Sequence, residues 1–170
     1  PESKYPEPLE DCYEGLRWVR SNAKSLGVDT ARIGVSGASA GGCLAAGLAL
    51  LARDRGEFPI AFQALIYPMI DDRQITPSSN WADPVWPPNA NTYGWRSYLG
   101  ELTGDAVPMY AAAARATNLA GLPPTFISVG ALESGFNRPT DFSSTSAGGL
   151  PSVPHIMAPG EYVNSAASRD

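Results

Sequence analysis

RIGVSGASAGG, residues 32–42, is the stretch that decides the fold of this chain. Its first part, Ile33 to Ser36, is a short run of high β-propensity. From Ala40 to about Arg55, leucines recur at three- or four-residue spacing, which is typical of a helix. The predicted order is therefore a strand, a tight glycine-rich turn and a helix.

The turn between these elements carries the pattern G-x-S-x-G, with Gly37, Ser39 and Gly41 in the fixed positions. The pattern is typical of a nucleophile elbow, whose serine has a strained backbone and an exposed hydroxyl above the sheet. Side chains two residues before or after the serine would collide with the neighbouring strand or helix, so we expect glycine there. We also expect the Ala40 backbone N–H and the positive helix end to face a developing oxyanion.

The alternative is an ordinary glycine-rich turn, such as one that cradles a phosphate. No lysine follows the glycines, as a P-loop would require. Asp54 falls at a helix end and not at a strand end, which argues against a dinucleotide site. We favour the elbow because its structural context is predicted together with its pattern.

The bulk composition fits one globular domain and excludes several classes of partner. The chain has 170 residues, 44% of them hydrophobic, which is enough for a real core. The net charge of -5 and the lack of a basic run argue against a nucleic-acid partner. No apolar run of roughly 18 residues occurs, so we expect no membrane span, and no signal peptide is indicated. Nothing in the sequence indicates an oligomeric state.

The two cysteines, Cys12 and Cys43, both lie among apolar neighbours in predicted helices. Free buried thiols are commoner there than a disulfide bond. This favours a reducing, cytoplasmic compartment.

Further elements alternate along the chain. They are a helix from about Leu9 to Leu26 that stops at Gly27, strands at Ile60 to Met69 and Thr125 to Gly130, a short helix at Tyr110 to Ala116, and a weak fourth strand at Val153 to Met157. Strands separated by helices or long connections imply a parallel sheet, so the class is α/β, with about four strands flanked by helices.

Residues 71–100 are expected to form a long loop, with at most a helical turn at Trp95 to Leu99. The loop is rich in Asp, Pro, Asn and Ser, interleaved with Trp81, Trp86, Tyr93, Trp95 and Tyr98. These aromatic side chains could wall an apolar substrate pocket or attach the loop to the core, and the sequence leaves both alternatives open.

A serine nucleophile needs a base, and the base needs a carboxylate that orients it. Glu133 directly follows a predicted strand and is the best carboxylate candidate, with Asp141 second. His155 is the single histidine of the chain and hence the candidate base. It lies within the predicted fourth strand, where the pleat fixes its side chain, so a structural role is the stronger interpretation.

Five segments resemble one family in both sequence and order. They begin at Pro8, Gly37, Leu50, Leu65 and Leu122 and read PLEDCY, GASAGGCLAA, LLARDRG, LIYPM and LPPTFISVGAL. The family is the hormone-sensitive-lipase-like branch of the α/β-hydrolases, which includes acetyl esterases and carboxylesterases. The likeness runs from about Tyr5 to Glu133.

The resemblance implies a partial α/β-hydrolase fold and a carboxylic-ester hydrolase. Ser39 matches the family's nucleophile and Ala40 its elbow donor to the oxyanion hole, while Glu133 stands where the family usually has Asp. The implied mechanism is a serine acyl-enzyme on small-molecule esters with short to medium acyl groups, without a metal or organic cofactor.

Two departures from the family pattern accompany this resemblance. The turn at Pro159 to Tyr162 is followed by Val163 and Asn164, where His-Gly is expected, and His155 resembles a non-catalytic strand position. The family's first strands and His-Gly-Gly oxyanion loop would precede Pro1.

We therefore expect a single domain over 1–170 that lacks the N-terminal part of the family fold and matches poorly over 134–170. Our hypothesis is a fragment of a longer esterase, with a reading frame disrupted after Glu133 and little or no turnover by itself. The alternative is a non-catalytic hydrolase-like fragment or binding protein that keeps the elbow as scaffold.

Overall fold

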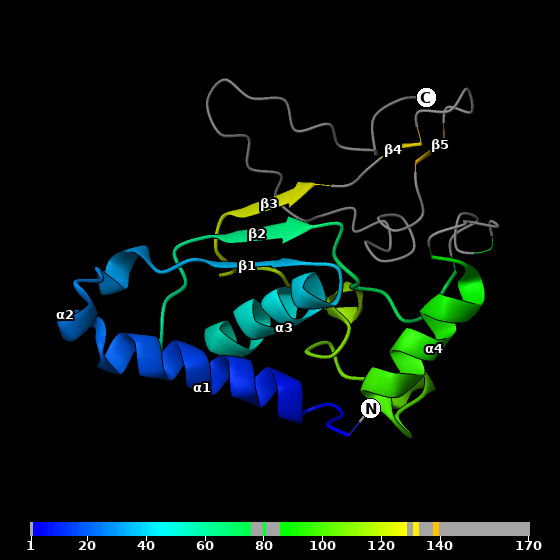
Figure 1. Cartoon of the computed structure of the whole chain (residues 1–170), viewed down its shortest axis with the longest axis horizontal. Coiled ribbons are helices and arrows are strands. Elements are labelled where there is room, and N and C mark those ends of the chain that lie inside the picture. Colours follow the sequence, from blue (N-terminus) through cyan, green and yellow to red (C-terminus); the bar gives the residue numbers. More distant parts are fainter. Residues whose placement is uncertain (1, 76–79, 81–85, 129–130, 133–137, 140–170) are drawn as a thin grey trace.

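The computed structural model describes residues 2–75, 80, 86–128, 131–132 and 138–139. Its centre is a three-stranded parallel sheet in the order β1-β2-β3 (Figure 1). The strands are β1 (Val35–Ala38), β2 (Gln63–Ile66) and β3 (Thr125–Ser128). A separate antiparallel pair joins β4 (Ala131–Leu132) to β5 (Arg138–Pro139). The predicted α/β class is confirmed, while the expected strand at Val153 to Met157 lies outside the described residues.

The three parallel strands end level with one another. Ala38 pairs with Ile66, and Ile66 pairs with Ser128. Each of these residues is the last of its strand. The segments that leave the strands therefore meet at one edge of the sheet, where ligands bind in open parallel sheets.

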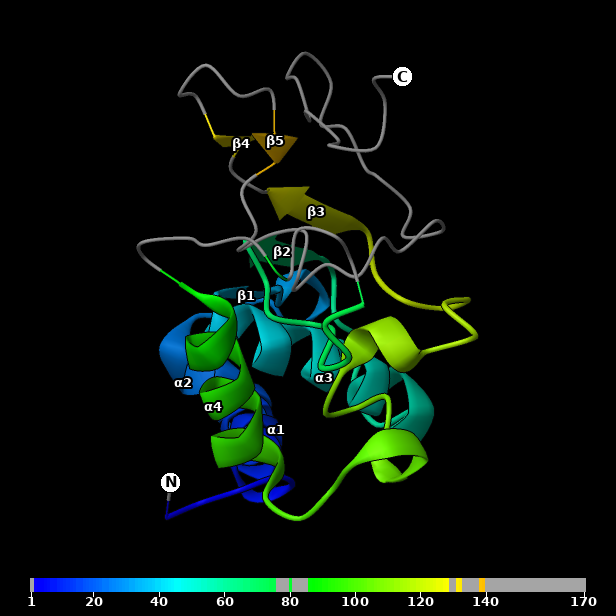
Figure 2. The same ribbon diagram turned by 90° about the vertical axis from the view of Figure 1, so that its right-hand side faces the viewer.

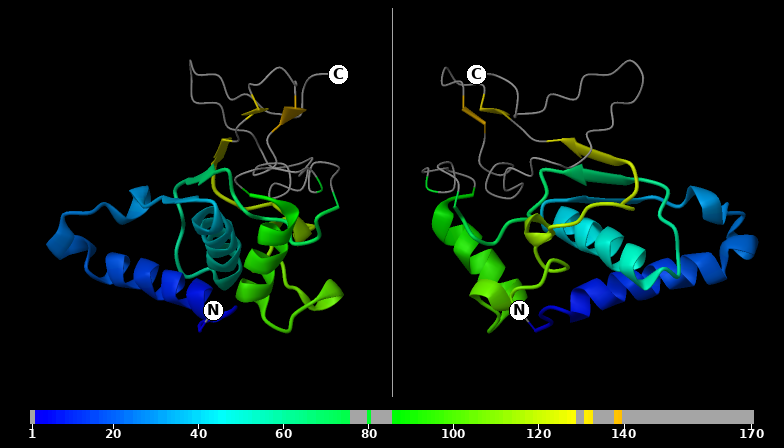
Figure 3. Two further views of the ribbon diagram at one scale, coloured as in Figure 1. Left: turned by 45° about the vertical axis from the view of Figure 1, so that its right-hand side comes forward. Right: turned by 180° about the vertical axis from the view of Figure 1, so that it is seen from behind.

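Two helices cover one face of the sheet in successive layers (Figures 1 and 3). Helix α3 (Ala40–Arg55) packs directly against β1 and β2, and α1 (Glu7–Ser21) packs on the outside of α3. Because α3 lies between sheet and helix, every residue from Gly42 to Ala52 except Leu44 is buried. The predicted bounds of α3 are confirmed, and Gly56 ends it in the left-handed conformation at φ 67°.

The first helix is shorter than the sequence predicts. It ends at Ser21, and a separate turn, α2 (Ala23–Leu26), follows. Asn22 interrupts the helix, because its side-chain amide donates 2.8 Å to the Trp18 carbonyl and its own carbonyl accepts from the Ser25 hydroxyl at 2.8 Å. Gly27 then closes α2 at φ 66°, at the stop position that the sequence indicates. A 3₁₀ turn, η1 (Thr30–Arg32), leads into β1.

The expected long loop over 71–100 is wrong for its last part, which forms helix α4 (Pro88–Leu99). Pro88 occupies the first helical position, where its missing N–H costs nothing. Asn91, Trp95 and Leu99 lie four residues apart and are the buried residues of this helix. The spacing was present in the sequence, but Gly94 and the polar neighbours concealed it. Trp95 thus follows the packing alternative, whereas Tyr93 is 69% exposed.

Helix α4 stands at the edge toward which the strands point, close to the N-terminus (Figures 1 and 2). The Tyr5 N–H donates 2.8 Å to the Tyr98 carbonyl. A cluster of buried side chains joins this helix to the start of α3, and it comprises Cys43, Met69, Trp95, Leu99, Val107, Ala111 and Ala112.

Two 3₁₀ turns follow α4, η3 (Gly104–Ala106) and η4 (Ala113–Arg115). The second replaces the short helix expected at Tyr110 to Ala116. Within the described ranges, no helix is long and apolar enough to cross a bilayer.

Candidate active site

Ser39 occupies the turn between β1 and α3 in a backbone conformation that side chains rarely adopt. Its φ is 57° and its ψ is -123°. A non-glycine residue held in such a region stores strain on the order of 1–3 kcal/mol, and such strain gathers at functional sites. The strained conformation predicted at Ser39 is therefore observed, at the carboxyl edge of the sheet.

Backbone hydrogen bonds on both sides hold Ser39 in this conformation. Its N–H donates 3.0 Å to the Ile66 carbonyl at the end of β2. Its carbonyl accepts from the N–H of Met69 and the N–H of Cys43, both at 3.1 Å. The turn is thus bonded to the next strand, to the segment beyond that strand and to its own helix.

The glycines around Ser39 differ in what requires them. A Cβ on Gly37 would overlap the backbone carbonyl of Gly41, and one on Gly42 would lie 2.8 Å from the Pro68 Cβ. A Cβ on Gly41 would meet no described atom within 4 Å. The steric reason predicted for glycine is confirmed at Gly37, whereas at Gly41 no described atom requires a glycine.

The start of α3 can stabilise negative charge beside the serine. Ala40 is the first residue of the helix. The first four N–H groups of a helix have no partner within it, and the helix dipole places partial positive charge there. An oxyanion formed next to Ser39 would therefore meet a donor and a favourable field.

The described part of the structure does not include the other candidate catalytic residues. Glu133, Asp141 and His155 all lie outside the described residues. In the part of the chain that is described, no group of three or more His, Cys, Asp or Glu side chains is placed to hold a metal ion. The roles of the carboxylate and the base remain predictions.

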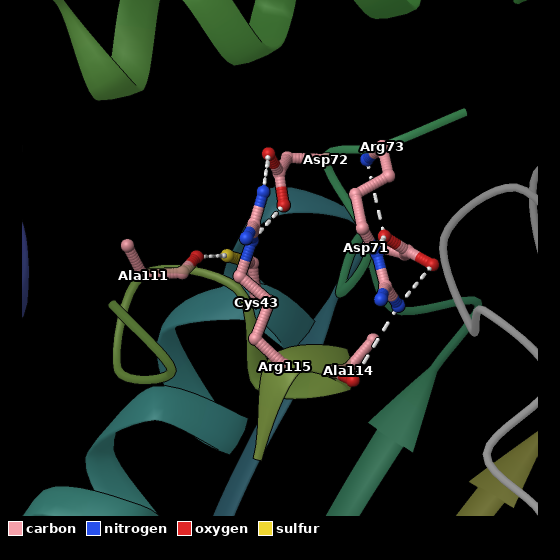
Figure 4. Close-up of polar contacts among 7 residues, drawn as sticks. All are labelled: Cys43, Asp71, Asp72, Arg73, Ala111, Ala114 and Arg115. Carbon is pink, nitrogen blue, oxygen red and sulfur yellow. Dashed lines mark hydrogen bonds and ion pairs between the residues drawn. The ribbon is translucent and has the colours of Figure 1, made fainter. Parts of the chain in front are cut away.

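A network of ion pairs that was not predicted from the sequence follows β2 (Figure 4). The Arg115 guanidinium donates from Nε and Nη2 to the two Asp72 carboxylate oxygens, at 2.6 and 2.8 Å. Arg73 donates in the same bidentate way to Asp71, at 2.7 and 2.9 Å. The signal in the sequence was the run Asp-Asp-Arg at residues 71–73, shortly after β2, but this run does not indicate which residue pairs with Asp72.

The Cys43 thiol lies in the first turn of α3, next to this network. Its Sγ donates to the Ala111 carbonyl at 3.3 Å (Figure 4). Burial, and then the charge of Asp72, raises the pKa of the Cys43 thiol to about 12. Because the thiolate is the reactive form, Cys43 is not a competing nucleophile at neutral pH. Both cysteines are free, as predicted, with Cys43 buried and Cys12 half-buried.

A small apolar cavity of about 30 Å³ lies elsewhere, between α3, the sheet and residues 113–122. Gln63 and Thr125, the first residues of β2 and β3, belong to its lining. The lining also includes Ile70, beyond the end of β2, so the cavity runs along the sheet and does not include Ser39, and its volume is enough to hold a water molecule.

Comparison with known proteins finds one hydrolase family and relatives that are named esterases. The profile of a family described as alpha/beta hydrolase fold matches residues 1–138. Esterase LipI of Mycobacterium tuberculosis is 42% identical over 131 residues, which are 76% of this chain and 41% of LipI. Carboxylesterase NlhH of the same organism is 52% identical over 68 residues, 40% of this chain and 21% of NlhH.

The similar solved structures are also of proteins named esterases. A bacterial heroin esterase superposes with a TM-score of 0.73 at 47% identity, over 76% of this chain and 43% of that one. Esterase LipW from Mycobacterium marinum superposes with a TM-score of 0.69 at 43% identity, over 75% of this chain and 40% of that one. The chain thus spans less than half the length of these relatives.

Proposed function

This chain is a member of the alpha/beta hydrolase fold family, and on that premise we propose that the protein is a carboxylic-ester hydrolase with Ser39 as its nucleophile. The observation that carries the proposal is the Ser39 turn: a strained serine at the carboxyl edge of the sheet, directly before a helix. The similarity to proteins named esterases supports the choice of an ester as substrate.

In the proposed reaction, the Ser39 Oγ attacks the ester carbonyl carbon and gives its proton to a base. The carbonyl oxygen becomes an oxyanion, which the Ala40 N–H and the positive end of α3 stabilise. The tetrahedral intermediate then collapses, the alcohol leaves with a proton, and an acyl group remains on Ser39. Water hydrolyses this acyl-enzyme and regenerates the serine. The step sequence uses no metal or organic cofactor.

The base and its orienting carboxylate are assigned from the sequence. We propose Glu133 as the carboxylate, with Asp141 as the second choice. His155 is the single histidine of the chain and hence the candidate base, but its place in a predicted strand favours a structural role. Val163 occupies the position where the resemblance expects the catalytic histidine. Loss of the histidine from a serine triad lowers kcat by about a millionfold, so we propose that hydrolysis by this chain is impaired.

Val163, in place of the expected catalytic histidine, favours a second candidate function. A hydrolase-like chain without its base could serve as a non-catalytic fragment or binding protein that keeps the elbow as scaffold. The two candidates differ in what Ser39 does with an ester.

The test is hydrolysis of an aryl acetate by the wild-type chain, Ser39→Ala and Ser36→Ala. Ser36 is an exposed serine on β1, the strand that leads to Ser39, and therefore a matched control. We expect slow hydrolysis that Ser39→Ala abolishes and Ser36→Ala preserves. Equal rates for wild type and Ser39→Ala would support the scaffold instead.

A further inference from the structure

The position of Ser39 depends on the segment that leaves β2. Ile66 and Met69 make the two backbone hydrogen bonds that link the serine to another part of the chain. The first turn of α3 also rests on this segment, because Gly42 lies against Pro68. A shift of residues 66–69 would therefore move the serine.

This segment is anchored in turn to η4, more than 40 residues later in the chain. The Ala114 N–H donates to the Ile70 carbonyl at 2.9 Å. The Arg115 guanidinium donates two parallel hydrogen bonds to the Asp72 carboxylate, 43 residues earlier in the chain. Arg73, held by Asp71, also reaches the Ala114 carbonyl at 3.5 Å (Figure 4).

The first turn of α3 is tied to the same anchor. The bond from the Cys43 thiol to the Ala111 carbonyl joins the helix to the chain just before η4. The serine, the segment after β2 and residues 111–115 thus form a closed ring of contacts. Within this ring, Asp72 and Arg115 supply the ionic link.

The environment of this pair makes the link strong. The Asp72 and Arg115 side chains are 10% and 15% exposed. Bidentate, charge-assisted hydrogen bonds that are shielded from water are stronger than neutral ones, and removal of one partner leaves a charge uncompensated. The Arg17–Glu57 pair, whose side chains are 45% and 43% exposed, is of the kind that contributes little.

We propose that Asp72 and Arg115 are positioning residues for the Ser39 nucleophile, acting through the segment that ends β2. This inference rests on the proposed function for its chemical consequence, whereas the mechanical link from the ion pair to the serine backbone does not. The two parts can therefore be tested separately.

The test compares Arg115→Lys with Arg53→Lys in the 170-residue chain. Lysine keeps the charge but loses the planar fork that grips a carboxylate twice. Arg53 is the matched control, because its side chain is also 15% exposed, it pairs with Asp54 at 2.6 Å and it donates to the Asn118 carbonyl at 2.8 Å. That link lies at the opposite end of α3 from Ser39.

The first readout is amide hydrogen exchange at Ser39 and Met69, with Leu51 and Ala52 of α3 as the reference for global unfolding. In Arg115→Lys, we expect the Ser39 and Met69 amides to exchange about tenfold faster than in wild type, while the exchange rates of the reference amides stay the same. We expect Arg53→Lys to leave both unchanged. Asp72→Asn, which keeps the shape of the side chain, should reproduce the effect from the other partner.

The second readout is the rate at which an aryl acetate acylates Ser39. Because small misplacements of a reacting group lower rates steeply, we expect about a tenfold to hundredfold loss in Arg115→Lys, with KM unchanged. Unchanged exchange at Ser39 and Met69 in both Arg115→Lys and Asp72→Asn would overturn the positioning inference. Absence of acylation in the wild-type chain would overturn the proposed function, and exchange would still decide the mechanical link.

Discussion

Replacement of Gly37 by alanine probes the turn that carries Ser39. The added Cβ would overlap the Gly41 carbonyl and lie 2.7 Å from the Gly42 nitrogen, both of them backbone atoms of the first turn of α3. Relief requires α3 to move away from β1, and overpacking of this kind destabilises by roughly 1–3 kcal/mol. Since no flexible side chain can yield here, we expect about 3 kcal/mol, the upper end of that range.

Gly41→Ala is the matched control, because the same methyl group added four residues later meets no described atom within 4 Å. Alanine favours a helix over glycine by roughly 1 kcal/mol, so this variant should be as stable as wild type or slightly more stable. Urea unfolding followed by circular dichroism measures both. Equal stability of the two variants, or greater loss in Gly41→Ala, would refute the steric account of the turn.

Three further outcomes follow from the buried groups. Iodoacetamide at pH 8, a working value chosen about where an ordinary thiol ionises, should alkylate half-buried Cys12 before Cys43, which should react only after unfolding, as peptide mapping would show. The pKa of the Cys43 thiol is about 12 in the folded chain against an ordinary value of 9.0, so the folded state keeps a proton that the unfolded state loses. Its stabilisation is thus complete below pH 9.0 and disappears as the pH rises toward about 12, and urea titrations should show a shallower alkaline decline in Cys43→Ala. Trp95→Ala should destabilise by about 3–5 kcal/mol, because the side chain is 3% exposed in the cluster that joins α4 to α3; a loss below 1 kcal/mol, roughly that of a surface change, would contradict that packing.

The local part of the fold could be predicted from the sequence. The turn at Ser39, the bounds of α3 and the stop at Gly27 depend on glycine and on helical spacing within a few residues of each other. The first helix was predicted too long, because the side chain of Asn22 bonds a helix carbonyl and ends the helix at Ser21. Each of these features is determined by residues that are close neighbours in the sequence.

The features that the sequence analysis missed depend on partners far along the chain. Helix α4 forms because Trp95 packs beside Cys43 and Met69, neighbours that composition cannot reveal. Asp72 finds Arg115 across 43 residues, and a lone Asp-Asp-Arg run is more often a solvated surface. The lack of a described atom near a Cβ at Gly41 likewise depends on what surrounds the turn.

We propose above all that the Ser39 hydroxyl takes the acyl group of an ester. The most direct test of this proposal is mass spectrometry of the peptide that contains Ser39 after incubation with an aryl acetate and acid quenching. We expect one acetyl group on Ser39 in the wild-type chain and in Ser36→Ala, and none on this peptide in Ser39→Ala. An unmodified Ser39 peptide, or the same acetylation in Ser39→Ala, would contradict the proposal.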